Sequence, residues 1–240
     1  MTRALVFFVL CVLSVACRST SAAGDRAREY VLVVLRRGAN TAERSEVERA
    51  EIQAAHMANI QRLAKEGVLV VAGPFGQPNT DPTRRGLFIF DVANIARARE
   101  LAGTDPAVQA GVLAMECIPL RTRADLRRAS TVDLGLSADV DSGALAEFPM
   151  HRFTLAIVGG GAKARAALER GIAPGRVLLV GRCGGALQGS NVAILDAPDV
   201  AHAEELLAPL RGELGALDLV PWWASETLTK LPEWALESPR

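Results

Sequence analysis

The chain has no excess of charge of either sign. Its 240 residues include 27 Lys plus Arg and 27 Asp plus Glu, so the net charge is zero and the pI is about 6.8. Proteins that bind nucleic acid or anionic membrane surfaces normally carry a basic excess. We therefore expect no nucleic-acid partner. Half of the residues are hydrophobic, which is enough to bury a core and excludes a wholly disordered chain.

Cysteine and histidine are scarce, with four and three residues. No two cysteines form the C-x-x-C pair typical of zinc modules. Residues 159–164 satisfy G-x-G-x-x-A, a weak dinucleotide motif, but the next expected strand ends at Gly181-Arg182 without an acid to bind a ribose. We therefore predict neither a metal nor a cofactor.

The sequence also lacks an apolar run of the roughly 20 residues needed to span a bilayer. The apolar run from Ala4 to Ala16 has 13 residues and follows Arg3. This pattern is typical of a secretory signal peptide. We therefore assign residues 1–23 to a signal sequence and expect a bacterial protein exported to the periplasm or cell envelope.

Two processing sites are compatible with this signal. Ser21-Ala22-Ala23 offers small residues to an ordinary signal peptidase, whereas Ser14-Val15-Ala16-Cys17 resembles a lipobox with Ser14 in place of the usual leucine. We favour lipidation of Cys17, because a cysteine directly after such a run is otherwise hard to explain. The expected membrane contact is then the lipid anchor alone.

The rest of the chain is an internal duplication. Four blocks recur in the same order, at offsets of 122, 108, 105 and 102 residues. Each copy predicts the order strand, helix, strand, strand, helix, strand, which is the split ferredoxin-like plan. The matched blocks are 30–35 with 152–157, 67–73 with 175–181, 88–101 with 193–206, and 115–119 with 217–221.

A sheet that carries helices on one face only leaves its other face apolar and exposed. Two copies in one chain can cover these faces mutually. We therefore predict an α+β fold in which two ferredoxin-like repeats form an intramolecular pseudo-dimer, a barrel of the dimeric α+β type. The expected parts are a first repeat at 29–120, a linker at 121–150, a degenerate second repeat at 151–226, whose first helix is about 14 residues shorter, and a tail at 227–240.

His56 is the main candidate for chemistry. Ile52, His56 and Ile60 recur at helical spacing, so His56 is expected to point from the first helix towards the sheet. A histidine on such a face is either a packed residue with one satisfied hydrogen bond or a group for proton transfer and anion binding. The sequence leaves both interpretations open.

The first repeat resembles the YCII-related (YciI-like) domain family. The motifs are Ala55-His56, Gly67, Ala72-Gly73-Pro74, Asp105-Pro106, Ala110-Gly111 and Pro119, spread over about 90 residues. The resemblance implies dimeric α+β barrels with a histidine that acts beside an acidic residue in a cleft between helix and sheet, and a few members are lyases or dehalogenases of small lactones.

Carried over to this chain, the resemblance implies that His56 is the acid or base, and that Gly73, Pro74 and Asp105 shape a ligand pocket. Arg85 is a further candidate, for an anionic substrate. Where many members have an acid nine residues after the histidine, this chain has Lys65, so the dyad is expected to be incomplete. Glu66 lies about 80° away by helical phase and is a marginal replacement.

Three functions remain open. The favoured one is an exported protein that binds a small organic molecule in a cleft around His56. The alternatives are a lyase or hydrolase that uses His56 as general acid or base, and a non-catalytic periplasmic scaffold. The sequence also leaves open whether Cys117 and Cys183, on strands expected at sheet edges, form a disulfide or remain two separate buried thiols.

Overall fold

The computed structural model describes residues 27–40, 42–138, 149–171 and 175–237. The predicted signal sequence up to residue 23, with Cys17, lies outside these residues. The strands are β1 (Arg28–Arg37), β2 (Leu69–Pro74), β3 (Arg84–Phe90), β4 (Leu113–Thr122), β5 (Met150–Val158), β6 (Val177–Cys183), β7 (Asn191–Leu195) and β8 (Leu217–Ser225). The α-helices are α1 (Glu46–Lys65), α2 (Ile95–Ala102), α3 (Pro106–Gln109), α4 (Leu126–Ala138), α5 (Gly161–Arg170), α6 (Val200–Leu207) and α7 (Leu231–Glu237), with 3₁₀ turns η1 (Gly185–Leu187), η2 (Ala208–Glu213) and η3 (Glu226–Lys230).

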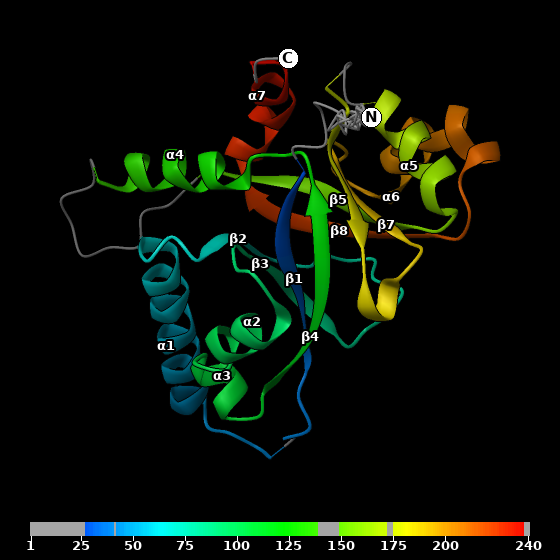
Figure 1. Cartoon of the computed structure of the whole chain (residues 1–240). Helices are drawn as coiled ribbons and strands as arrows, with labels where there is room; N and C mark the ends of the chain where they lie inside the picture. Colours follow the sequence, from blue (N-terminus) through cyan, green and yellow to red (C-terminus); the bar gives the residue numbers. More distant parts are fainter. Residues whose placement is uncertain (1–26, 41, 139–148, 172–174, 238–240) are drawn as a thin grey trace, which may run out of the picture.

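All eight strands belong to one antiparallel sheet in the order β2-β3-β1-β4-β6-β7-β5-β8. The first four and the last four follow the same ferredoxin-like order, so each strand of the first half has an equivalent in the second. The two halves join edge to edge where Leu120, Arg121 and Thr122 of β4 pair with β6. The predicted α+β fold of two ferredoxin-like halves is confirmed, as one sheet nearly closed into a barrel (Figure 1).

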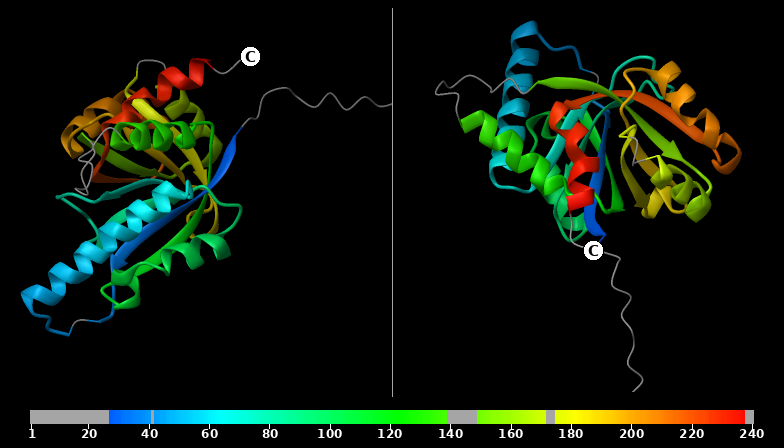
Figure 2. Two further views of the ribbon diagram at one scale, coloured as in Figure 1. Left: turned by 90° about the vertical axis from the view of Figure 1, so that its left-hand side faces the viewer. Right: turned by 90° about the horizontal axis from the view of Figure 1, so that it is seen from above.

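Alternating residues of the strands face the two sides of the sheet. In β1, Tyr30, Leu32 and Val34 point into the barrel and join one buried cluster with Phe153 and Trp222 of the second half. The intervening valines face the helices of their own half. This two-sided burial explains the nearly continuous apolar run of β1, since both faces of the strand are covered. The helices α1, α2, α5 and α6 pack on the outside of the barrel. The helices α4 and α7 instead add Leu126, Ala129, Leu231 and Trp234 to the inner cluster (Figure 2).

A seam between β2 and β8 brings the remaining two edges together. Phe75 forms an isolated antiparallel bridge with Trp222. The indole Nε1 of Trp222 donates to the carbonyl of Gly73 at 3.1 Å, and the backbone N–H of Gly76 donates to the carbonyl of Pro221 at 2.7 Å. A Cβ on Gly73 would lie 1.8 Å from the carbonyl oxygen of Trp223, so only glycine allows this approach. The seam therefore depends on the glycine of the Ala72-Gly73-Pro74 motif.

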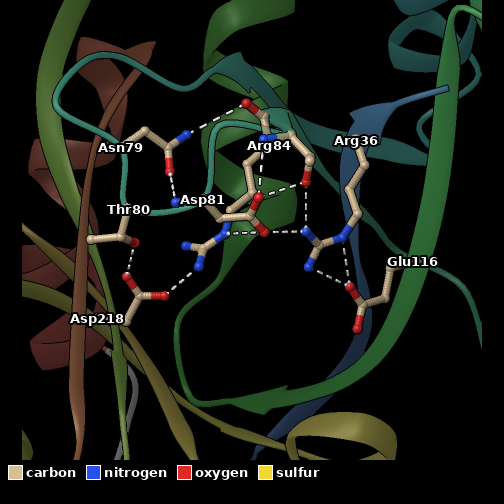
Figure 3. Close-up of polar contacts among 8 residues, drawn as sticks. Arg36, Asn79, Thr80, Asp81, Arg84, Glu116 and Asp218 are labelled. Carbon is tan, nitrogen blue, oxygen red and sulfur yellow. Dashed lines mark hydrogen bonds and ion pairs between the residues drawn. The ribbon is translucent and has the colours of Figure 1, made fainter.

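An ion-pair network lies at the same seam (Figure 3). Arg84 of β3 pairs with Asp218 of β8 at 2.5 Å and with Asp81 of the β2–β3 loop at 3.5 Å. Asp81 also pairs with Arg36, which in turn holds Glu116 of β4 at 2.8 Å. Hydrogen bonds from Thr83, and next from Arg36, hold the pKa of the Asp81 carboxyl well below its ordinary value. The network ties the loop to four strands, β1, β3, β4 and β8, of which β8 belongs to the other half.

The first helix, α1, begins at a capping box. The Ser45 hydroxyl accepts from the Glu48 backbone N–H at 3.2 Å, and the Glu48 carboxylate accepts from the Ser45 backbone N–H at 2.7 Å. The helix ends before Gly67, whose φ of +72° suits glycine. Of its 20 residues only Asn59 and Leu63 are buried, so most of α1 stands away from the sheet. Its equivalent α5 has 10 residues, so this helix is shorter as predicted, but by 10 residues instead of about 14.

The region predicted as a linker contains α4. This 13-residue helix packs against β2 and η3. The guanidinium of Arg128 on α4 lies 4.8 Å from the ring centre of Trp234 on α7, a cation–π contact. In Figure 1, α4 crosses the first half beside the C-terminal end of α1, where the two helices are in contact.

Cys117 and Cys183 are free thiols. The strands that carry them do meet, because Leu120 of β4 lies opposite Cys183 of β6. Cys117 is three residues from Leu120, and an odd offset turns a side chain to the other face of a sheet. Cys183 therefore packs inside the barrel and Cys117 packs on the helix side. The disulfide alternative is wrong for this reason.

Candidate functional site

A cleft of about 850 Å³ lies between α1 and the strands β2 and β3 and extends to α4. Its size falls within the roughly 300–1,000 Å³ of small-molecule sites, and its walls are mostly apolar. It exists because α1 stands away from the sheet, as the sparse burial of that helix shows. The apolar side chains of its walls include Leu35, Ile52, Met57, Ile60, Leu69, Val70, Val71, Phe88, Val112, Leu113, Leu134 and Leu228.

His56 lies on the wall of this cleft, in the middle of α1. Its Nδ1 is 2.7 Å from Oδ2 of Asp105, and its side chain is 14% exposed. Its ring stacks on that of Phe88 at an interplanar angle of 21°, with 6.1 Å between the ring centres. The carboxylate and the phenyl ring together fix the orientation of the imidazole.

Asp105 is held by the backbone and by one amide. It is the N-cap of α3, where Oδ1 accepts from the Ala107 backbone N–H at 2.8 Å. Its Oδ2 lies 3.5 Å from Nδ2 of Asn59, and its side chain is fully buried. Because a buried carboxylate needs such partners, Asp105 is confined to one position, behind the imidazole.

The expectation that the histidine lacks an acidic partner is wrong, because Asp105 supplies the carboxylate. Glu66, the marginal replacement, instead pairs with Arg62 on the exposed side of α1 at 2.6 Å. Lys65 is exposed. The Asp-Pro dipeptide marks Asp105 as a helix cap, but the contact with His56 spans 49 residues of sequence and arises only where α1 packs against α3.

Gly73, Pro74 and Arg85 line the cleft, as does His56. The predicted pocket role of Asp105 needs a correction: Asp105 contacts His56 and is not among the cleft-lining residues. Gly73 serves the seam as well, because its missing Cβ admits the Trp223 carbonyl.

Sequence reasoning missed Asn59, which belongs to the site by its position three residues after His56. Its Oδ1 accepts from Arg62 at 2.8 Å and from the Thr104 hydroxyl at 3.1 Å, so its amide nitrogen is directed towards Asp105. The helical spacing of three residues was the available signal, since it places Asn59 on the face of His56.

The connecting helix α4 and the second half of the chain complete the cleft. Ser130, Asp133 and Leu134 of α4 line it, together with Met150 and Ser225. The Ser225 hydroxyl donates to the Asp133 carboxylate at 2.8 Å, and burial raises the pKa of Asp133 above its ordinary value. The periodic patterns of the first repeat gave no signal for these residues, because the residues come close to the cleft only when the barrel closes.

The described residues contain no group of three or more His, Cys, Asp or Glu side chains arranged to hold a metal ion. A search of the same residues finds no helix with the length and apolar character to cross a membrane.

These features define a single-chain α+β barrel whose first half holds a histidine–carboxylate pair at a helix–sheet cleft. Residues 31–120 match the model of the YCII-related domain family, so the chain carries a YCII-related domain in its first half. This confirms the family that the motifs around His56 and Gly73 predicted. The match stops before the second half, and a comparison with curated proteins gives no match.

Proposed function

We propose that this protein binds a small organic molecule in the α1 cleft, and that His56 moves a proton to or from the bound molecule. The observation that carries this proposal is the 2.7 Å contact between His56 and Asp105 at the wall of an 850 Å³ cleft. The alternative of a packed, sealed histidine is disfavoured, because the ring lines the cleft and remains partly exposed.

The geometry suits general acid–base work. A carboxylate beside Nδ1 accepts a hydrogen bond from the proton of that nitrogen and holds the ring in one tautomer, which leaves the other nitrogen as the acceptor. Asp105 lies behind the ring, so Nε2 is the nitrogen left for a molecule in the cleft, and no described residue hydrogen-bonds to it. Nε2 is therefore the proposed base, and its protonated form the proposed acid.

A lyase or hydrolase reaction is consistent with this arrangement and with what the family resemblance implies. A scaffold without a ligand would have no use for a fixed histidine–carboxylate pair beside a cavity of this size. A binding protein without catalysis would need the cleft, but not Nε2 with a free lone pair.

The test compares two histidine–aspartate pairs of the same chain. A library of small organic acids, lactones and esters is screened by thermal shift against the wild type, His56→Gln and Asp105→Asn. The matched control is His151→Gln, because His151 lies 3.0 Å from Asp196 in the second half and does not line the cleft.

We expect compounds that stabilise the wild type and the His151 control. Turnover of any such compound is expected to fall about 10²–10⁴-fold in His56→Gln and to fall also in Asp105→Asn. Equal turnover in wild type and His56→Gln would refute the proton-transfer role, and equal loss in the His151 control would show that the effect is not specific to the cleft.

We further propose that the protein is an exported lipoprotein anchored through Cys17. The support is the charged residue, apolar run and lipobox-like tetrapeptide of the sequence. Processing there would leave residues 17–240, carrying a diacylglyceryl thioether. Intact mass of the membrane fraction tests this, and a soluble mature protein that begins at Gly24 would refute it.

A further inference from the structure

The cleft follows most of the length of α1. The α1 residues that line it run from Arg49 to Ala64, which is about 22 Å at 1.5 Å per helical residue. Such a slot suits an elongated ligand better than a compact one.

One end of this slot is positively charged. Arg37 ends β1, Arg44 and Arg49 lie at the start of α1, and Arg85 is in β3. Arg44 donates to the carbonyl of Ala110 at 3.1 Å, which places it beside the loop that leads into β4. Arg37, Arg49 and Arg85 form no ion pair with any other described residue. Glu43 is the one acidic lining residue of this end, so the charges do not cancel.

The other end of the slot has no basic residue among the described residues that line it and is mostly apolar, with Gln61, Ser130, Asp133 and Ser225 as its polar side chains. Ile60 and Ala64 of α1, Leu69 of β2 and Leu134 of α4 form its walls. Figure 1 shows α4 crossing the first half here, beside the C-terminal end of α1. The one acidic lining residue on this side is Asp133, and a carboxylate there repels an anionic group.

We infer that the ligand of the cleft is an elongated amphipathic organic acid, with its carboxylate among the arginines and its apolar chain directed towards α4. The inference rests on the proposed function, because it names the substrate class of the same cleft. His56 lies between the two ends, so the reacting bond is near the middle of the slot and not at the charged head.

The chain length and the head group of such a ligand should each change its affinity by a measurable factor. Burial of each methylene group stabilises a complex enough to tighten Kd about fourfold. A carboxylate paired with these arginines, compared with a neutral hydroxyl at the same place, should tighten Kd by up to about tenfold, because Arg37, Arg49 and Arg85 are exposed and solvent screens each pair. Affinity should therefore rise with chain length and with a negative head group, and the second effect should weaken as salt is added.

The experiment measures Kd by isothermal titration calorimetry, with hexanoate, octanoate, decanoate and 1-decanol kept below their aggregation limits. The full set is run on the wild type, on Arg49→Gln and on Arg85→Gln. Arg97→Gln is the matched control, since Arg97 is exposed on α2 and pairs with Glu100 away from the cleft.

We expect affinity to increase in the order hexanoate, octanoate, decanoate, and decanoate to bind up to about tenfold more tightly than decanol. Either cleft arginine variant should weaken the binding of decanoate about three- to tenfold and leave the Kd of decanol unchanged. The Arg97 control should bind both compounds as the wild type does. Leu134→Ala should reduce the gain from octanoate to decanoate, because it removes part of the apolar end.

Two results would overturn the inference. One is equal affinity for decanoate and decanol in the wild type, and the other is affinity that does not change with chain length. Failure of this inference can be told from failure of the proposed function, because the Kd series varies only the head group and the chain, whereas the proposed function is measured by His56-dependent turnover. If a compact or neutral compound is turned over in a His56-dependent way while decanoate does not bind, the inference fails and the proposed function stands.

Discussion

Replacement of Gly73 by alanine tests whether the barrel is closed at the β2–β8 seam. The added Cβ would lie 1.8 Å from the Trp223 carbonyl oxygen and 3.0 Å from Nε1 of Trp222. Because real contacts of a Cβ are essentially never closer than 3.0 Å, the two strands must separate by more than about 1 Å. The atom in the way belongs to the backbone, so a change of rotamer cannot relieve the clash.

The expected cost has two parts. Forced overpacking of a buried contact costs about 1–3 kcal/mol. Separation of the strands also breaks the 3.1 Å hydrogen bond from Trp222 to Gly73, and a buried donor without an acceptor costs about 1–3 kcal/mol. The free energy of unfolding should therefore fall by about 2–6 kcal/mol, a large share of the roughly 5–15 kcal/mol of a typical domain.

The measurement is urea unfolding followed by circular dichroism, with the slope m compared between variants. Gly135→Ala is the control: nothing lies within 4 Å of its added Cβ, and alanine in the interior of α4 should stabilise by about 0.5–1 kcal/mol. Gly181→Ala, at the equivalent β4–β6 junction, should cost less than Gly73→Ala, because its Cβ meets the Leu120 side chain instead of backbone.

A Gly73→Ala protein within about 0.5 kcal/mol of the wild type would refute the closed seam. Trp222→Phe gives an independent check, since it removes the donor but keeps most of the packing, and should cost about 1–3 kcal/mol. The losses of unfolding free energy caused by Gly73→Ala and Trp222→Phe should not add in the double variant, because both substitutions act on the same contact.

Three further predictions concern other buried groups. Burial raises the pKa of Asp133, so the Asp133 carboxyl binds its proton more tightly in the folded protein than in the unfolded chain. The stability that the protonated Asp133 contributes is therefore lost as the pH rises from about 4 through the raised pKa. Asp133→Asn should therefore raise the free energy of unfolding more at pH 7 than at pH 3.5, and equal gains would contradict this. Burial also raises the pKa of the Cys183 thiol to about 12, so iodoacetamide at pH 8 should not alkylate Cys183 in the folded protein. Non-reducing peptide maps should show Cys117 and Cys183 unbridged. Rapid labelling of Cys183 in the native protein would contradict its burial. Arg84→Met should cost about 1–3 kcal/mol in urea unfolding, because it leaves Asp218 without its 2.5 Å partner, and no change would mean that the network of Figure 3 adds no stability.

Local rules predicted much of this fold from the sequence. Repetition of four blocks showed that the chain holds two copies of one plan, and the apolar strands of each copy required a second layer to cover them. The spacing of Ile52, His56 and Ile60 placed the histidine on the cleft face of α1. These features depend on residues close together in sequence, or on periodicity, so they can be read without coordinates.

The tertiary structure decided the contacts between distant segments. His56 meets Asp105 because α1 packs against α3, and no spacing rule links residues 49 positions apart. The helix α4, between the two halves, and Met150 and Ser225 of the second half reach the cleft because the barrel closes at the β2–β8 seam. Cys117 and Cys183 lie on adjacent strands, yet the register of β4 against β6 turns them to opposite faces of the sheet. Sequence periodicity determines which face of an element is buried, whereas the register and packing of whole elements determine which buried groups touch.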